Sequence, residues 1–271
     1  MNGDLVDKFE LINDDNIDDH IFDIFSNNKP PSNLGFINKS SNEIEVTLPN
    51  AQIDLNIKQS LSQLSSRDKQ GTTGFICWYS SLLFSDWLLS KTCPIKLSKD
   101  MSIFELGSGV GGICASTISK SVGKFIASDQ KQILKLLKEN VTNNVDHFTS
   151  RTIKNSFGRG PNIEVIEFDW EDIDQGKYNY KEAEDRLPDV IIACDTIYNE
   201  YLIPHFINSF KSLLNSNNFV LICIQLRDAI TIEKFIQSIV EDEQLLIYSI
   251  PNSLSTTQLS NGYIVFYIKL L

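Results

Sequence analysis

The chain has 271 residues, enough for one α/β domain with an appended segment, and its 42% hydrophobic and 22% charged content is that of a soluble globular protein. No apolar run approaches the roughly 18 residues of a membrane span, and the polar, acidic start of the sequence argues against a secretory signal. Its five cysteines and three histidines are scattered without the spacing of a metal site. We therefore expect reduced cysteines, no bound metal, no membrane contact and a location in the cytosol or the nucleus.

The net charge of −11 is concentrated near the N-terminus, where residues 1–50 carry ten acidic residues and three lysines. The rest of the chain is only mildly acidic. This balance argues against a phosphate-binding surface, and therefore against direct nucleic-acid binding, but it permits a basic protein partner. A solvated acidic tail without a binding role also explains such a charge run, so both interpretations stay open.

The elements in the first third of the chain form an appended segment. Residues 1–30 mix aspartates with isoleucine and phenylalanine, which favours a short docking helix. The stretch "EIEVTLPNAQIDLNI" (43–57) alternates around a Pro-Asn turn and predicts a β-hairpin, and residues 75–90 predict an amphipathic helix. We expect an acidic N-terminal arm over residues 1–60, followed by one domain over residues 61–271.

Strand and helix patterns alternate in the remainder of the chain. The predicted strands are 101–106, 124–128, 163–169, 190–193, 219–226, 244–250 and 262–271, and the predicted helices lie near 113–121, 133–145, 201–214 and 231–241. This alternation predicts a doubly wound, mostly parallel seven-stranded sheet with helices on both faces, in a Rossmann-like α/β fold. The final strands suit a sheet whose last strand is antiparallel and lies at the edge.

A glycine-rich stretch, "ELGSGVGG" (105–112), follows a predicted strand and opens a helix. Gly107 and Gly109 permit a tight turn and a close approach of the backbone to a ligand. Asp129, at the end of the next strand, is placed to accept hydrogen bonds from both hydroxyls of a ribose. NAD and S-adenosylmethionine each present such a ribose, and the glycines also satisfy a dinucleotide fingerprint, so these motifs indicate only a nucleoside cofactor. A plain glycine turn with a surface aspartate is the structural alternative.

Residues on either side of these motifs favour S-adenosylmethionine. Glu105, two residues before the first glycine, is usual in methyltransferases and unusual in dinucleotide folds. Asp169 and Trp170 end the third strand, where they can hydrogen-bond to an adenine and stack on it. A Rossmann-fold oxidoreductase would also be expected to bring a catalytic domain, and none follows in this sequence. We count all three residues among those expected at the cofactor.

The stretch "VIIACDTIYNE" (190–200) joins a buried strand to Asp195 and Tyr198, polar groups of the kind that is rarely buried without partners. We take both as candidate catalytic residues. Methyltransferases that act on base amines or glutamine amides usually carry two prolines after the acid, where this chain has Thr196 and Ile197. The structural alternative for Asp195 is a cap on a helix that begins near Glu200.

Taken together, Trp78, "ELGSG", "SDQ", "FDW" and "CDTIYNE" resemble the seven-β-strand protein-lysine methyltransferases of the methyltransferase-like 21 group. The resemblance covers residues 40–271, and the stretches 60–75, 128–140 and 195–203 resemble its fungal ribosomal branch in particular. It implies that the cofactor is bound by Trp78, Gly107, Ser108, Gly109, Asp129, Trp170 and Cys194. Ser108 stands where alanine is frequent in the family, a change too small to harm binding.

The resemblance implies methyl transfer from S-adenosylmethionine to the ε-amine of a lysine in a protein substrate, and we expect a monomer acting on a large-subunit ribosomal protein. Asp195 and Tyr198 match the DxxY signature at the family's substrate channel. A carboxylate stabilises the ammonium form of lysine, so we assign Asp195 to aiming the lysine and only weakly to removing its proton. Tyr198 would hydrogen-bond the amine or wall the channel. Transfer to nucleic acid or a small molecule, and a non-catalytic cofactor-binding role, stay open as alternatives.

Overall fold

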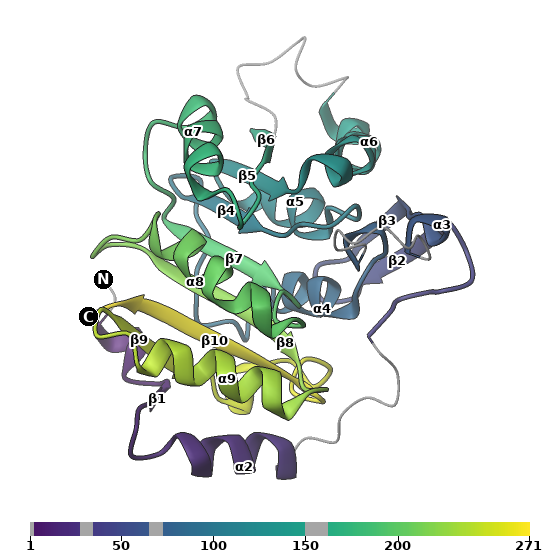
Figure 1. The fold of residues 1–271 in the computed structure, drawn as a ribbon. Coiled ribbons are helices and arrows are strands. Elements are labelled where there is room, and N and C mark those ends of the chain that lie inside the picture. Colours follow the sequence, from purple (N-terminus) through teal and green to yellow (C-terminus); the bar gives the residue numbers. More distant parts are fainter. Residues whose placement is uncertain (1–2, 28–34, 65–72, 150–161) are drawn as a thin grey trace.

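The computed structural model describes residues 3–27, 35–64, 73–149 and 162–271. Its centre is an eight-stranded sheet with the order β1-β9-β10-β8-β7-β4-β5-β6 and helices on both faces (Figure 1). The parallel strands are β4 (Ser102–Leu106), β5 (Lys124–Asp129), β6 (Ile163–Glu167), β7 (Val190–Cys194) and β8 (Phe219–Gln225). The others, β1 (Glu10–Ile12), β9 (Leu245–Ser249) and β10 (Tyr263–Leu270), are antiparallel to their neighbours. The predicted doubly wound, mostly parallel α/β fold is confirmed.

Each face of the sheet has its own hydrophobic core. One face is covered by α4 (Tyr79–Leu88), α5 (Ile113–Ile118) and α6 (Lys131–Thr149), and the other by α2 (Ile17–Asn27), α7 (Ile173–Ala183), α8 (Ile203–Lys211) and α9 (Ala229–Val240). Along β7, Val190 and Ile192 belong to the first core and Ile191 and Ala193 to the second. The strand is apolar throughout because successive side chains point to opposite faces and both faces are covered.

Short helical turns occupy several of the connections between these elements. They are α1 (Gly3–Val6), α3 (Leu61–Leu64), η1 (Thr73–Phe75), η2 (Ser119–Ser121), η3 (Glu200–Leu202) and η4 (Asn252–Leu254). Within the part of the chain that the structure describes, no helix has the length and apolar character needed to cross a membrane.

The sheet differs from the seven-stranded prediction at its antiparallel end. β1 comes from the N-terminal arm and pairs with β9, which adds an eighth strand. β10 does not lie at the edge, because it inserts between β8 and β9. β1 has only three residues, of which Ile12 alone is buried, so it is too short to produce a periodic signal in the sequence. Strand order depends on pairing between distant segments, which local patterns do not report.

Two helices predicted near the N-terminus are present, and the second of them is shorter than expected. The docking helix expected within residues 1–30 is α2, which turns His20 and Ile24 inward. The helix expected over residues 75–90 is α4, which begins only at Tyr79 because Trp78 has an extended backbone. The N-terminal arm therefore joins the sheet through β1 and packs against α9 through α2.

The predicted hairpin is present as β2 (Glu43–Leu48) and β3 (Ile53–Lys58), which form a separate two-stranded sheet. Its inward residues alternate with exposed ones, and they pack against α4 and the start of α5: Ile44, Val46, Leu48, Leu55 and Ile57. The outer edge of β3 faces α6, a helix far away in the sequence.

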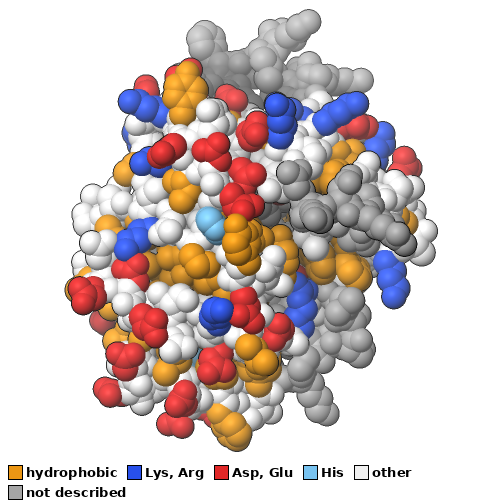
Figure 2. Space-filling view, viewed as in Figure 1, with side chains coloured by type: hydrophobic (Ala, Val, Ile, Leu, Met, Phe, Trp, Pro, Cys, Tyr) orange, Lys and Arg blue, Asp and Glu red, His pale blue; other side chains and the backbone are white. Residues whose placement is uncertain are grey.

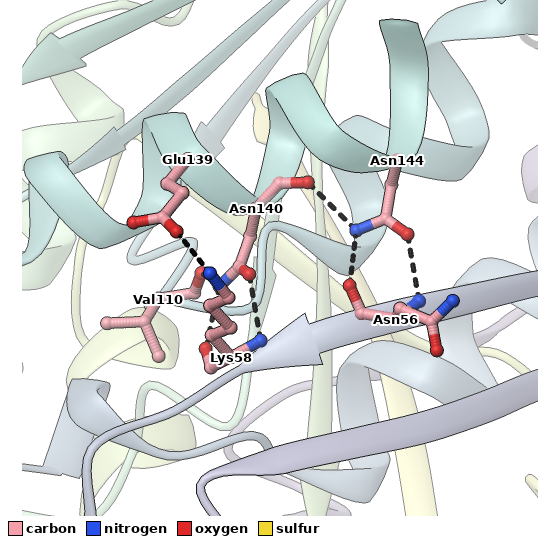
Figure 3. A network of polar contacts seen from close by, with 6 residues as sticks. All are labelled: Asn56, Lys58, Val110, Glu139, Asn140 and Asn144. Carbon is pink, nitrogen blue, oxygen red and sulfur yellow. Dashed lines mark hydrogen bonds and ion pairs between the residues drawn. The ribbon is translucent and has the colours of Figure 1, made fainter. Parts of the chain in front are cut away.

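Side-chain amides of α6 satisfy this outer edge as a neighbouring strand would (Figure 3). Asn140 accepts a hydrogen bond from the backbone N–H of Lys58 at 2.8 Å and donates to the Lys58 carbonyl at 2.7 Å. Asn144 makes the same pair of bonds with Asn56, at 2.9 and 2.8 Å. Asn140 also donates to the carbonyl of Val110, in the turn after β4, at 2.7 Å. One fully buried amide thus ties the hairpin to the glycine-rich turn.

Replacing Asn140 with alanine is expected to lower the free energy of unfolding by about 3 kcal/mol, because backbone groups of Lys58 and Val110 lose their partner inside the protein. Asn143→Ala is the matched control, since this amide is exposed on the same helix, and it should change stability by less than about 0.5 kcal/mol. Urea denaturation followed by tryptophan fluorescence measures both variants. Equal midpoints would show that the Asn140 bonds add nothing to stability.

Candidate active site

A cavity of about 340 Å³ opens at the carboxyl ends of the parallel strands, where the chain order reverses on the two sides of β4. Ligands of doubly wound sheets bind at such a switch point. The lining includes every site residue predicted from the sequence except Glu105: Trp78, Gly107, Ser108, Gly109, Asp129, Asp169, Trp170, Cys194, Asp195 and Tyr198. The fold therefore brings together motifs that lie far apart in the chain.

Three glycines shape the turn that forms one wall of this cavity. Gly107, Gly109 and Gly112 have φ values of 74°, 61° and 53°, in the left-handed region that favours glycine. A Cβ atom on Gly107 would lie 3.0 Å from the ring of Trp170 and 3.2 Å from the methyl group of Thr196. The backbone therefore runs closer to Trp170 and Thr196 than a residue with a side chain would allow.

Glu105 lies beneath this turn and does not line the cavity. Glu105 is 1% exposed, and its carboxyl group accepts a hydrogen bond from the Ser108 hydroxyl at 2.8 Å. Burial raises the pKa of Glu105 to about 7, and hydrogen bonds from Cys114 and Ser108 oppose that shift. The carboxyl group is thus placed to support the turn from below, whereas the sequence suggested contact with a cofactor.

Asp129 is half-buried at the end of β5, and both of its carboxylate oxygens accept backbone hydrogen bonds. Oδ2 accepts from the N–H of Gly109 and Oδ1 from that of Gln130, each at 2.8 Å. Burial raises the pKa of Asp129 to about 6, while the two backbone bonds act in the opposite direction. At neutral pH the group is therefore largely ionised. It ties the glycine turn to β5 and still lines the cavity.

Asp169 and Trp170, which the sequence places at the end of the third strand, follow the end of β6 and line the cavity. The indole of Trp170 packs on Phe206 with ring centroids 4.9 Å apart, so it is held from behind by the second core. Asp169 accepts a hydrogen bond from the side-chain amide of Gln130 at 3.2 Å. An aromatic face and a carboxylate are therefore available on the side of the cavity where Asp129 lies.

Asp195 has a side chain that is only 2% exposed, and its backbone lies in the left-handed region at φ 57°. Its Oδ2 pairs with Nη1 of Arg227 at 3.0 Å. Its Oδ1 is buried and has no hydrogen-bond partner among the residues that the structure describes. Burial raises the pKa of the Asp195 carboxyl, and the Arg227 charge, together with a backbone hydrogen bond from Gln225, counteracts this shift. A paired carboxylate with one open acceptor therefore lies in the cavity wall.

The structural alternative for Asp195, a helix cap, is wrong. The turn η3, which begins at Glu200, is capped by Asn199, whose side-chain oxygen accepts a hydrogen bond from the N–H of Tyr201 at 3.0 Å. Asp195 takes no part in this cap. Helix capping therefore does not explain why the Asp195 carboxyl group is buried beside a cation.

Arg227, just after the end of β8, is the site residue that sequence reasoning missed. Its Nη1 also donates to the side-chain oxygen of Gln225 at 2.9 Å, and its guanidinium carbon lies 5.0 Å from the centroid of the Trp78 ring. No motif marks it. The usable signal is a cation directly after a central strand, at the sheet edge where Asp195 lies. The cavity lining also includes Thr73, Gln130, Thr196 and Tyr201, which lie within or beside the quoted motifs but are not among the predicted site residues.

Trp78 and Tyr198 are the partly exposed members of the predicted set on the side of Arg227. Trp78 donates its indole N–H to the carbonyl of Thr73 at 3.1 Å and packs on Phe36 with ring centroids 4.6 Å apart. Tyr198 is 37% exposed as a residue, and burial raises the pKa of its hydroxyl, while a hydrogen bond with the Thr73 side chain opposes this shift. Tyr198 also lines a smaller adjoining hollow together with Arg227. Two aromatic side chains thus flank the buried ion pair.

The face of the molecule that Figure 2 shows carries hydrophobic side chains among many acidic ones. Near the cavity, Tyr201 is 63% exposed and donates a hydrogen bond to the exposed Glu171 at 2.9 Å. This bond joins the segments that follow β6 and β7. Asp228, beside the smaller hollow, is also exposed. Carboxylates are therefore available to a basic ligand that approaches either opening.

The chain is similar to known proteins along most of its length. A family model described as "Lysine methyltransferase" matches residues 53–242. A ribosomal lysine N-methyltransferase 5 from Lachancea thermotolerans is 27% identical, with 91% of this chain and 95% of that protein covered. A protein of the same name from Zygosaccharomyces rouxii is 29% identical, with 77% of each covered. Among solved structures, a putative S-adenosylmethionine-dependent methyltransferase from Streptococcus mutans has 13% identity and a TM-score of 0.48, with 85% of this chain and 56% of that one covered.

The family match takes in the glycine turn, the end of β7 and Arg227, so it spans the whole cavity described above as well as more than half of the chain. This protein belongs to the lysine methyltransferase family.

Proposed function

We propose that this enzyme methylates a lysine of a large-subunit ribosomal protein and that the lysine meets the methyl donor, S-adenosylmethionine, in the cavity at the switch point. The observation that carries this proposal is the buried Asp195 carboxylate, which keeps one acceptor oxygen unpaired in the wall of a cavity bounded by a glycine turn. Its relatives from Lachancea thermotolerans and Zygosaccharomyces rouxii are named ribosomal lysine N-methyltransferases, which supports the choice of substrate.

The residues of the cavity fit S-adenosylmethionine. Asp129 offers acceptor lone pairs to the ribose hydroxyls, and the glycine turn lets the backbone approach the methionine part. Trp170 offers an aromatic face to the adenine. Four further lining residues would complete the contacts: Trp78, Ser108, Asp169 and Cys194. When bound, the cofactor supplies a methyl group on a sulfonium, and the S–CH₃ electron pair returns to sulfur as the N–CH₃ bond forms.

Two buried acceptors are arranged to orient the lysine amine. Oδ1 of Asp195 and Oγ1 of Thr196 both lack hydrogen-bond partners among the described residues, and both residues line the cavity. Buried polar groups are costly to leave unpaired, so a donor group from the substrate would satisfy them. A neutral amine that donates its N–H groups to such acceptors keeps its lone pair free for the methyl group. Tyr198 would close the channel beside the amine.

The charge distribution supports a basic protein as the substrate. Exposed acidic side chains lie near the cavity at Glu171 and Asp228, and α2 and the residues before it expose Asp14, Asp15, Asp18, Asp19 and Asp23. Such a field attracts a basic partner and repels phosphates. We further propose that the enzyme acts as a monomer in the cytosol or the nucleus, without direct contact to nucleic acid. Residues 61–271 would be its catalytic unit, and residues 1–60 would be an arm that adds β1 to the edge of its sheet and the hairpin β2–β3 beside it.

Incubation of the protein with methyl-labelled S-adenosylmethionine and isolated large-subunit ribosomal proteins should place the label on lysine. Mass spectrometry of the labelled band identifies the modified side chain. Treatment with protease or with nuclease before counting separates protein from nucleic-acid acceptors. Label that survives protease and is lost to nuclease would point to a nucleic-acid substrate and would contradict the proposal.

Asp129→Ala should weaken the binding of S-adenosylmethionine at least tenfold, because it removes the ribose acceptor and also the partner of the Gly109 N–H. The loss corresponds to roughly 1–3 kcal/mol. Titration calorimetry measures the affinity. Asp242→Ala, which removes a half-buried aspartate from the Lys211 ion pair, is the control and should bind normally. An unchanged affinity in Asp129→Ala would show that the ribose lies elsewhere.

Asp195→Asn should leave the affinity for S-adenosylmethionine within about threefold but lower kcat/KM for the protein substrate by about 30- to 150-fold, because a charge-assisted hydrogen bond to the amine is lost. Calorimetry and methyl incorporation measure the two quantities. Asp189→Asn is the matched control, since this half-buried aspartate bonds to Ser102 just before β7, at the opposite end of the same strand. Full activity of Asp195→Asn would remove Asp195 from the mechanism.

A further inference from the structure

Arg227 contacts three parts of the site at once. It donates to Asp195 Oδ2 at 3.0 Å and to Gln225 Oε1 at 2.9 Å, and its guanidinium lies 5.0 Å from the Trp78 ring. Its side chain is 20% exposed, so the contacts are made largely out of water. A guanidinium is planar and always charged, and it is suited to holding a carboxylate while it stacks on an aromatic ring. The contacts with Asp195, Gln225 and Trp78 together fix the position of the Arg227 guanidinium.

A buried carboxylate next to a lysine creates a chemical conflict. The amine must reach the methyl group with a free lone pair, whereas an isolated carboxylate stabilises the protonated ammonium, which has none. The effect is strong in a water-poor cavity, where charges are weakly screened. A cation on the far side of the carboxylate reduces this preference, because it repels the ammonium while the carboxylate oxygen can still accept an N–H.

We propose that Arg227 is a positioning residue for methyl transfer: it fixes the Asp195 carboxylate and offsets its charge, so that the lysine is held as the neutral amine. This inference rests on the proposed role of Asp195 in orienting the lysine. The different partners of the two Asp195 oxygens support this role: Oδ2 accepts a hydrogen bond from Arg227, and Oδ1 has no hydrogen-bond partner among the described residues. Arg227 acts through Asp195 and is not itself placed in the lining of the main cavity.

Among the residues that the structure describes, the other titratable groups around this pair do not supply the same charge. Burial raises the pKa of Cys194, on β7, to about 11, and it raises the pKa of Cys223, on β8, and Tyr263, on β10, well above their ordinary values. These three groups are therefore neutral near pH 7. Asp228, before α9, is exposed, and a hydrogen bond from the Thr231 hydroxyl lowers its pKa, so it is ionised but screened by water. The charge balance at Asp195 thus depends on Arg227.

Arg227→Met tests the proposal, because it keeps a long, partly buried stem and removes the charge. Two changes follow, and both move the acid side of the pH profile of kcat/KM to higher pH. The Asp195 carboxyl, whose pKa burial already raises, needs a higher pH to ionise. Once ionised, it holds the lysine more firmly as the ammonium. Methyl incorporation into isolated large-subunit ribosomal proteins should fall about 30-fold at pH 7 and recover as the pH approaches 10.

Arg227→Lys keeps the positive charge but loses the planar guanidinium group. The acid side of its pH profile of kcat/KM should therefore stay where it is in the parent, while kcat/KM falls by at most about tenfold.

Lys211→Met is the control, because it removes the half-buried cation of the Lys211–Asp242 pair, and it should change neither the pH profile nor kcat/KM. The double variant Asp195→Asn with Arg227→Met should be no slower than Asp195→Asn alone, because residues acting as a unit are not additive. A uniform loss of rate in Arg227→Met, without a shift of the profile, would reduce Arg227 to a structural support and overturn the proposal.

A second readout does not depend on the substrate. Carbon-13 NMR follows the titration of the Asp195 carboxyl, identified by its absence in Asp195→Asn, and its pKa should be higher in Arg227→Met than in the parent and in Arg227→Lys. An unchanged Asp195 titration would overturn the charge offset, whatever the enzyme methylates. A parent enzyme that labels no ribosomal protein would instead overturn the proposed substrate, and the NMR comparison would still decide the role of Arg227.

Discussion

The turn after β4 has to satisfy its backbone hydrogen bonds while it leaves one side open to a ligand, and the rest of the site depends on how it does so. The N–H groups of Gly107 and Ser108 both donate to the carbonyl of Ser128, and that of Gly109 donates to Asp129. Unpaired backbone groups are costly inside a protein, so each of these bonds constrains the turn. Because its partners come from β5, the cavity keeps its shape only while the two strands stay in register.

The same requirement extends to elements outside the central sheet. The N–H of Val110 donates to the carbonyl of Gly74, ahead of α4, and its carbonyl accepts from Asn140 of α6. Asn140 in turn holds the edge of β3 through Lys58. The N-terminal hairpin is therefore mechanically connected to the wall of the active site, although it contributes no residue to the described lining.

Burial raises the pKa of both of the most deeply buried carboxyl groups of the site, but their partners differ. Burial raises the pKa of Glu105 to about 7, and its partners among the described residues are a hydroxyl and a thiol, so the group is suited to a supporting role under the turn. Burial also raises the pKa of Asp195, but Arg227 lies 3.0 Å away and opposes this shift by favouring the ionised form. A charged group can remain buried only when a partner offsets the loss of water. The pairing therefore separates a structural carboxyl from one available to a substrate.

The amino-acid sequence by itself determined the parts of this protein that local patterns encode. Short apolar runs marked the central strands and alternation marked the hairpin, and glycine, Asp129 and Asp195 marked the ends of the strands where the cavity forms. Only the tertiary structure decided that β1 becomes an eighth strand, that β10 lies inside the sheet, and that Arg227 meets Asp195. These features arise from pairing between segments distant in the chain, and the free energy of such contacts depends on burial and charge in three dimensions, which no local spacing records.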